Sequence, residues 1–212
     1  MTRFGILGSG VVGQTLAAGL VKHGYEARIA TRTSGKLKDF TARTGITEGA
    51  FADVATWAQG LVLAVAGRVA RDALDQAGRA NLAGKLVIDV TNPIDSAPPE
   101  DGVLRYFTGP NESLMERLQD AFPEVKFVKA FNSVGNAAMV NPSYPNGPPT
   151  MFFCGNDDGA KAVVRRILDQ FGWEPADMGT AKAARAIEPL CQLWCIPGFR
   201  QGKWKHAFKM LE

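Results

Sequence analysis

A glycine-rich turn near the N-terminus constrains the fold more than any other part of the sequence. It follows the apolar run 4–7 and precedes a helical pattern over 11–23. A strand, a Gly-x-Gly-x-x-Gly turn and a helix together begin the βαβ unit that binds dinucleotides. Gly8 would permit the tight turn, Gly10 the approach of a pyrophosphate, and Gly13 close packing of helix on strand. We therefore predict a cofactor-binding turn, rather than a purely structural one, formed by Gly8, Ser9, Gly10, Val11, Val12 and Gly13.

Strand and helix patterns alternate through the first 133 residues. Strands are predicted at 26–31, 61–66, 85–90 and 126–131, and helices at 53–58, 69–77 and 113–121. Asp53 is expected to cap the helix at 53–58. Such alternation, with connections that are nearly always right-handed, favours a doubly wound, mostly parallel α/β sheet of the Rossmann type.

The pattern changes after Asn132. The Pro-rich segment 142–149 is predicted to be a loop, and its position leaves open whether it closes over the site as a lid. Strands at 151–154 and 173–178 flank an amphipathic helix at 160–171, and a helical region follows Lys182, in which Pro189 begins a helix or kinks one. We expect a dinucleotide-binding core at 1–133 and a small α/β extension at 134–212, which packs on the core and contributes to the substrate cleft and to dimer contacts.

Composition excludes several classes of protein. Of 212 residues, 46% are hydrophobic and 21% charged, which is ordinary globular usage and unlike collagen, a coiled coil or a disordered chain. The net charge of +3 is too small to indicate a nucleic-acid partner. No apolar run approaches the ~18 residues of a membrane span, and the start does not resemble a signal peptide. Three cysteines without metal-ligand spacing favour a reducing compartment, so we expect a cytoplasmic protein without a metal site.

The end of the second predicted strand distinguishes NAD from NADP. An NAD site has an acidic residue there, which accepts a hydrogen bond from the ribose 2′-OH. Arg32 could instead pair with a 2′-phosphate and stack on adenine, and neighbouring hydroxyls could donate hydrogen bonds to it. The sequence therefore favours NADP(H) over NAD, with a solvated polar loop as the alternative. The hydroxyl and cationic residues are Thr31, Arg32, Thr33, Ser34, Lys36 and Lys38.

Later strand ends should meet the cofactor at the same edge of the sheet. The small residues at the ends 64–67 and 90–93 would leave room for it, and polar atoms at 131–133 could hold a carboxamide. Each of these segments could equally be an ordinary strand end.

The chain has no recognisable acid or base for carbinol oxidation. It contains no Tyr-x-x-x-Lys and no Gly-x-Ser-x-Gly, and its two histidines, His23 and His206, are expected at the surface. Cys191 and Cys195 are predicted to lie on a core or interface face of a helix rather than to form a redox pair. We therefore predict no catalytic side chain and favour hydride transfer between two cofactor-like rings.

Five motifs together resemble the NADPH-dependent reductases of the deazaflavin coenzyme F-420. They lie at 8–13, 30–33, 87–93, 129–133 and 187–190, and the cytosolic domain of a group of metalloreductases is similar over the same span. The resemblance implies a homodimer with NADP(H) at the glycine turn and a deazaflavin ring against the nicotinamide. It assigns the 2′-phosphate to 31–34. It assigns the nicotinamide pocket to Ala64, Val65, Ala66, Gly67, Asn92, Pro93, Ala130, Phe131 and Asn132.

Two alternatives remain open from the sequence. One is reduction of a small imine or keto compound, as in pyrroline carboxylate reductases, although their longer helical C-terminal domain does not fit after Asn132. The other is a non-catalytic NADP(H) sensor that docks to a partner through its basic tail, with Trp194 and Trp204. The acceptor, whether a deazaflavin or a flavin, the direction of flux and the dimer geometry stay undetermined at this stage.

Overall fold

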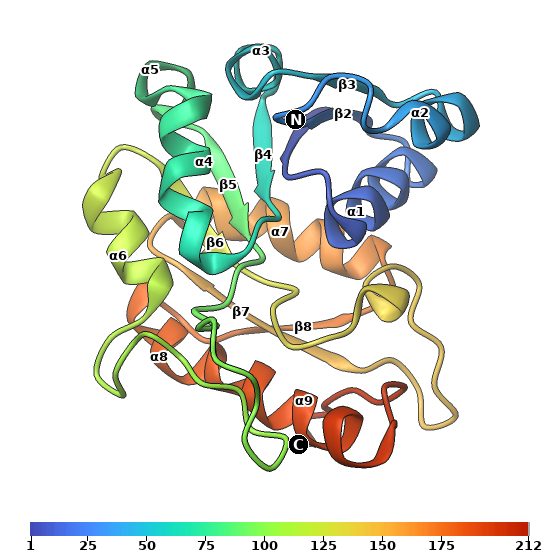
Figure 1. Cartoon of the computed structure of the whole chain (residues 1–212), viewed down its shortest axis with the longest axis vertical. Coiled ribbons are helices and arrows are strands. Elements are labelled where there is room, and N and C mark those ends of the chain that lie inside the picture. The colour runs from blue at the N-terminus through green and yellow to red at the C-terminus, as the bar shows by residue number, and fades with distance from the viewer. Residues whose placement is uncertain (212) are drawn as a thin grey trace.

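A single eight-stranded sheet organises the computed structural model, which describes residues 1–211 (Figure 1). The strand order is β3-β2-β1-β4-β5-β6-β7-β8, and all neighbours are parallel except β6 and β7. The prediction of a doubly wound, mostly parallel Rossmann-type sheet is therefore confirmed. The strands are β1 (Arg3–Leu7), β2 (Glu26–Ala30), β3 (Thr47–Gly49), β4 (Gly60–Leu63), β5 (Leu86–Asp89), β6 (Lys126–Lys129), β7 (Thr150–Gly155) and β8 (Glu174–Asp177).

Helices cover both faces of the sheet because the central strands are apolar on both sides. One hydrophobic cluster lies under α1, α2 and α7, and the other under α3, α4, α5, α6 and α8. No helix within residues 1–211 combines the length and apolar character needed to cross a membrane. The helices are α1 (Val11–Lys22), α2 (Lys38–Thr44), α3 (Phe51–Trp57), α4 (Ala70–Ala77), α5 (Arg79–Leu82), α6 (Leu114–Ala121), α7 (Asp158–Gln170), α8 (Ala184–Ile187) and α9 (Pro189–Gln201).

Several element boundaries differ from the sequence prediction. Asp53 does not cap α3, because that helix begins two residues earlier with Ala50 at its N-cap. The strand predicted at 61–66 ends at Leu63, and the chain then turns into a 3₁₀ segment, Gly67–Val69, before α4. The short elements α2 and β3 were not predicted, since neither carries a clear hydrophobic period. Pro189 begins α9 rather than kinking it, although Pro197 lies within that helix.

The segment after residue 133 continues the sheet of the N-terminal part. β7 pairs with β6 in the register Val128↔Gly155 and Lys129↔Cys154. Phe171, fully buried at the end of α7, lies 5.9 Å from Phe131 between ring centroids. One hydrophobic cluster thus contains side chains from both sides of residue 133. The C-terminal helices α8 and α9 gather at the end of the molecule opposite α2 and α3 (Figure 1).

Candidate functional site

The glycine turn between β1 and α1 has the geometry of a phosphate cradle. Gly8 has φ 131°, and a Cβ atom there would lie 2.3 Å from the carbonyl oxygen of Ala64. A Cβ atom on Gly13 would lie 2.1 Å from the carbonyl oxygen of Gly8, so helix and turn are in close contact. A Cβ atom on Gly10 would meet no atom within 4 Å. Gly10 is also the N-cap of α1 and provides no side chain to cap it, which leaves the first N–H groups of the helix for an anion.

A cavity of about 310 Å³ opens beside this turn. Arg32 makes no ion pair with any residue in 1–211, and Lys36 Nζ donates to Ser9 Oγ at 3.1 Å. These unneutralised cations suit a phosphate. The lining residues are Gly8, Ser9, Gly10, Thr31, Arg32, Thr33, Lys36, Phe51, Ala64, Val65, Ala66 and Val69.

A carboxylate on the neighbouring strand β3 holds the loop after β2 in place. Glu48 in β3 accepts hydrogen bonds from the backbone N–H groups of Gly35 and Leu37, so both of its carboxylate oxygens are bonded to the loop. The hydroxyl of Thr31 is bonded within the loop as well, at 3.2 Å from the Thr33 backbone nitrogen. Ser34 does not line the cavity. Thr31, Arg32, Thr33 and Lys36 do line it, and its positive charge comes from Arg32 and Lys36.

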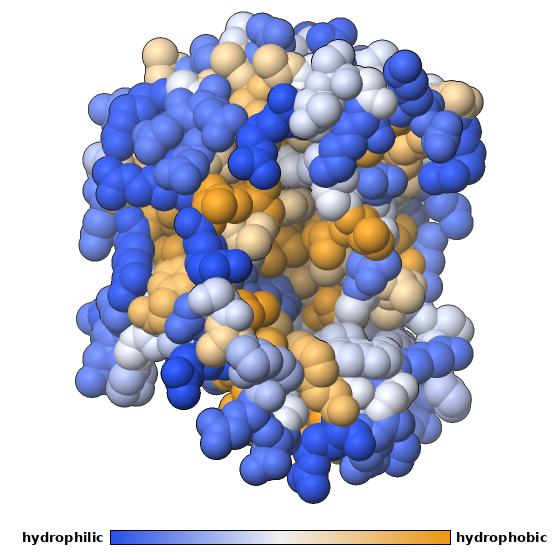
Figure 2. Space-filling model, viewed as in Figure 1, coloured by the Kyte–Doolittle hydropathy of each residue, from blue (hydrophilic) through white to orange (hydrophobic). Residues whose placement is uncertain are grey.

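A second cavity, of about 410 Å³, continues the first along the carboxyl ends of the strands. The two share Gly10 and the segment 64–66, and Figure 2 shows a hollow with hydrophobic side chains near the middle of this face. Small and apolar side chains dominate this part of the cleft, which suits planar rings. The lining residues are Gly10, Val11, Val12, Ala64, Val65, Ala66, Gly67, Arg68, Val90, Thr91, Asn92, Ile94 and Asp95.

Some residues assigned to the nicotinamide pocket lie behind the cleft rather than in its wall. Pro93, Ala130, Phe131 and Asn132 are buried and line neither cavity. Asn132 Nδ2 donates to Asn92 Oδ1 at 3.1 Å, and Asn92 Nδ2 donates in return to the carbonyl oxygen of Asn132 at 2.8 Å. The structure thus places Asn132 as a support for Asn92, which does line the cleft.

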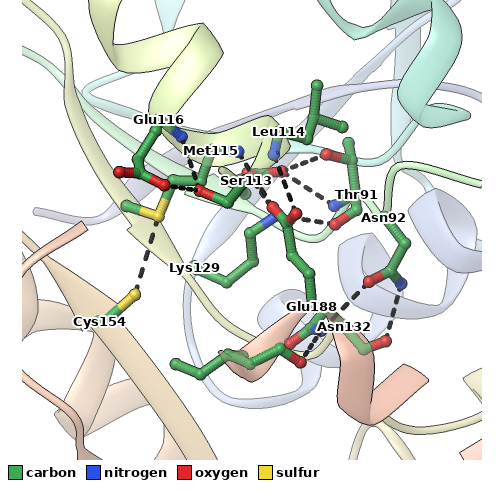
Figure 3. Close-up of polar contacts among 12 residues, drawn as sticks. Thr91, Asn92, Ser113, Leu114, Met115, Glu116, Lys129, Asn132, Cys154 and Glu188 are labelled. Atoms are coloured by element: carbon green, nitrogen blue, oxygen red, sulfur yellow. Dashed lines mark hydrogen bonds and ion pairs between the residues drawn. The ribbon is translucent and has the colours of Figure 1, made fainter. Parts of the chain in front are cut away.

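A buried ion cluster, not anticipated from the sequence, lies directly behind this wall (Figure 3). The ammonium group of Lys129 is 2.7 Å from Asp89 Oδ2 and 2.9 Å from Glu188 Oε1, and it donates to the carbonyl oxygen of Thr91 at 2.8 Å. The side chains of Lys129 and Asp89 are 0% exposed and that of Glu188 is 2% exposed. Burial lowers the pKa of Lys129, but the two carboxylates outweigh burial and raise it, so the lysine is charged.

Each carboxylate of the cluster also fixes the backbone of a neighbouring element. Asp89 Oδ1 accepts from the backbone N–H and the hydroxyl of Thr91, at 2.9 and 2.6 Å. The carboxylate of Glu188 accepts from the N–H groups of Leu114 and Met115 at the start of α6. Asp89, Lys129 and Glu188 lie within the sequence motifs 87–93, 129–133 and 187–190. A lysine within the apolar strand predicted at 126–131 was the one sequence feature that could have indicated a buried ion pair.

The remaining candidate groups lie away from the cleft. His23 contacts Asn141, and His206 stacks on Trp194 with 4.9 Å between ring centroids. Cys191 and Cys195 are buried free thiols on α9 and pack in a small hydrophobic cluster, as expected of a core face. Within residues 1–211, no three His, Cys, Asp or Glu side chains gather to hold a metal ion.

The fold and the cleft together define a Rossmann-type dinucleotide-binding protein. Comparison with known proteins is consistent with this class. The family model described as "NADP oxidoreductase coenzyme F420-dependent" matches residues 3–93. A solved structure from Arthrobacter sp. FB24, assigned to the F420-dependent NADP reductases, superposes over 100% of both chains with a TM-score of 0.93 and 32% identity.

Two sequence relatives extend the comparison. The F420-dependent NADP reductase of Methanocaldococcus jannaschii is 32% identical over 113 residues, which are 53% of this chain and 50% of that protein. Metalloreductase STEAP3 of Rattus norvegicus is 28% identical over 200 residues, 92% of this chain and 38% of that protein. The chain thus spans half or less of these two relatives. It belongs to the F420-dependent NADP oxidoreductase family.

Substitution of two of the glycines should separate binding from folding. We expect Gly13→Ala to destabilise the protein by about 1–3 kcal/mol, because its methyl group would overlap the Gly8 carbonyl. Gly10→Ala should leave the free energy of unfolding unchanged. It should weaken NADPH binding about tenfold or more, since the methyl group would occupy the space of the pyrophosphate. Urea denaturation and fluorescence titration with NADPH measure the two effects. Unweakened binding by the Gly10→Ala protein would contradict the phosphate-cradle assignment.

Removal of the buried lysine should be far more costly than removal of an exposed one. We expect Lys129→Met to destabilise the chain by about 3–5 kcal/mol, because two buried carboxylates would lose their shared cation. Lys126→Met is the matched control on the same strand, since its pair with Asp157 is 45% and 34% exposed and such pairs contribute about 0–1 kcal/mol. Equal midpoints of chemical denaturation for the two variants would show that the buried cluster is not a structural requirement.

Proposed function

We propose that this protein transfers a hydride between NADP(H) and a deazaflavin or flavin-like acceptor. The observation that carries the proposal is the pair of joined cavities. One has free cations beside a glycine turn, and the other has small and apolar walls. The first suits the 2′-phosphate and pyrophosphate of NADP(H), and the second suits a nicotinamide facing another ring. The names of the relatives in the F420-dependent family support the deazaflavin as acceptor.

The residues of the cleft would act by binding and positioning. When bound, NADPH supplies a hydrogen with its electron pair from the C4–H bond of the nicotinamide, and the acceptor ring takes up both. Arg32 and Lys36 would hold the 2′-phosphate, and the N–H groups at the start of α1 would hold the pyrophosphate. The side chains of Val11, Val12 and Val65 would exclude water from the ring-binding part. Holding two rings about 3–3.5 Å apart is the main requirement for such a transfer.

The wall at the end of β5 would set the depth of the ring-binding part. Asn92 is fixed by Asn132, and a Cβ atom on Gly67 would lie 2.1 Å from the Asn92 carbonyl oxygen. The loops after β4 and β5 therefore touch and cannot shift independently. A rigid wall of this kind preorganises the positions of the two rings without a proton-transferring side chain.

The protein would act in the cytoplasm as a homodimer, with residues 134–212 contributing dimer contacts and part of the substrate cleft.

A non-catalytic NADP(H) sensor is the competing function, and it differs in one measurable respect. A sensor would bind NADPH tightly without reducing any deazaflavin or flavin.

Removal of the cation at the end of β2 should change the cofactor preference. We expect Arg32→Gln to raise the KM for NADPH about tenfold or more, because a charge-assisted pair with the 2′-phosphate is lost, and to leave the KM for NADH nearly unchanged. Loss of deazaflavin absorbance with each cofactor is the assay. Arg43→Gln, an exposed change on α2 outside the cleft, is the control and should have no effect.

Two results would count against the proposal in different ways. Equal use of NADH and NADPH by the unmodified protein would contradict the assignment of the Arg32 loop to the 2′-phosphate. Tight NADPH binding without any bleaching of deazaflavin or flavin would contradict the proposed hydride transfer and favour the sensor.

A further inference from the structure

A half-buried carboxylate, that of Glu48, contacts the loop at 31–37 from the neighbouring strand. Glu48 lies in β3, a three-residue strand at the edge of the sheet, where it is paired with Ile29 of β2 (Figure 1). The backbone N–H of Thr31 donates to the carbonyl oxygen of Gly49 at 3.1 Å, so the pairing continues to the first residue of the loop. The backbone of Glu48 is therefore fixed against the end of β2 from which the loop departs.

Both oxygens of this carboxylate are bonded to the backbone of the loop. Oε1 accepts from the N–H of Gly35, and Oε2 accepts from the N–H of Leu37 at 2.9 Å. Glu48 forms no ion pair with any lysine or arginine in the described residues 1–211. Its charge is thus not used to neutralise Arg32 or Lys36, the cations that line the first cavity.

Other N–H groups of the loop are bonded within the protein as well. That of Thr33 donates to the hydroxyl of Thr31 at 3.2 Å, and that of Lys36 donates to the carbonyl oxygen of Thr33 at 3.3 Å. The N–H groups at positions 33, 35, 36 and 37 are therefore not free for a ligand. Recognition of a phosphate at this loop depends on its side chains, and the loop backbone sets where those side chains lie.

A carboxylate at this place has two opposite effects on a phosphate bound beside it. Its negative charge repels the phosphate. Its two charge-assisted hydrogen bonds, in contrast, fix the loop in the conformation that places the cations at the cavity. Glu48 does not line the first cavity, and both of its oxygens are already hydrogen-bonded. The second effect therefore outweighs the first.

We propose that Glu48 is a positioning residue that sets the preference for NADP(H) over NAD(H). By fixing the loop at positions 35 and 37, it holds Arg32 and Lys36 at the first cavity before the cofactor binds. The inference rests on the proposed function, because it takes the first cavity as the site of the 2′-phosphate. It concerns that phosphate alone and does not depend on which acceptor is reduced.

Two fragments of the cofactor measure this effect without any turnover. 2′,5′-ADP carries the 2′-phosphate and 5′-AMP lacks it. The Kd of 5′-AMP divided by the Kd of 2′,5′-ADP, both from calorimetric titration, therefore reports recognition of the 2′-phosphate. We expect Glu48→Gln to lower this ratio about fivefold or more, because an amide cannot accept from both N–H groups. The Kd of 5′-AMP should stay unchanged.

Two further variants separate position from charge. Glu48→Asp keeps the charge but is one methylene shorter, so it should lower the ratio as well. Glu26→Gln removes the same charge from an exposed residue at the opposite end of β2. It is the matched control and should keep the ratio of the unmodified protein.

A double-variant cycle tests whether Glu48 acts through the two cations. In the Arg32→Gln/Lys36→Gln protein, the added change Glu48→Gln should alter the ratio by less than about twofold, because no cation is left to be positioned. An equal loss in both backgrounds would show that the effect does not pass through Arg32 and Lys36, and would overturn the inference.

Other results would also overturn it. A higher ratio in Glu48→Gln would show that the carboxylate acts by repulsion, and an unchanged ratio in both Glu48 variants would show that it has no effect. Equal weakening of both ligands would indicate a general structural role. If the unmodified protein itself binds the two ligands equally, the assignment of the first cavity to the 2′-phosphate fails together with this inference. Failure to reduce a deazaflavin would instead refute only the proposed hydride transfer.

Discussion

The buried contact of Lys129 with Asp89 and Glu188 is the interaction on which the geometry of the cleft depends. Three charged groups removed from water are tolerated only when each is fully paired. Lys129 is in β6, Asp89 ends β5, and Glu188 precedes α9. These elements must therefore meet at one point, and Glu188 also binds the start of α6. The cluster locks the carboxyl edge of the sheet to the C-terminal helices.

The same ion cluster also fixes the wall of the cleft. Asp89 and Lys129 together fix both the N–H and the carbonyl group of Thr91, one residue before Asn92. Asn132, three residues after Lys129, bonds to Asn92 and also to the carbonyl oxygen of Ile187, next to Glu188. The position of Asn92 is thus determined from two directions. A cleft that works by holding rings in place needs a wall of this rigidity, and the charges behind it provide it without entering the site.

Local signals in the sequence were sufficient for the fold class and for one end of the cleft. The glycine turn could be predicted because strand, turn and helix adjoin in the chain, and the place of Arg32 because it lies two residues after β2. The short elements α2 and β3 could not, since their stability comes from contacts such as Glu48 with the loop at 35–37 rather than from their own periodicity. The ion cluster joins residues 89, 129 and 188. A pairing over such separations depends on the tertiary structure.

Phe131 illustrates the same limit at the level of one residue. Its place at a strand end suggests the cleft, but its backbone adopts φ 60° and its ring enters the core against Phe171. The direction of a side chain at a strand end is decided by the turn that follows, and the sequence does not encode that turn in a recognisable motif.

The most direct test of hydride transfer by positioning uses NADPH labelled with deuterium at C4 of the nicotinamide. With a 5-deazaflavin as acceptor, the product ring carries the transferred hydrogen on carbon, where it does not exchange with water. We predict that one of the two C4-labelled forms of NADPH delivers its deuterium to C5 of the deazaflavin, as seen by mass spectrometry and NMR. A reduced ring that contains only hydrogen from the solvent would show that the hydrogen is not passed directly between the rings, and would contradict this mechanism.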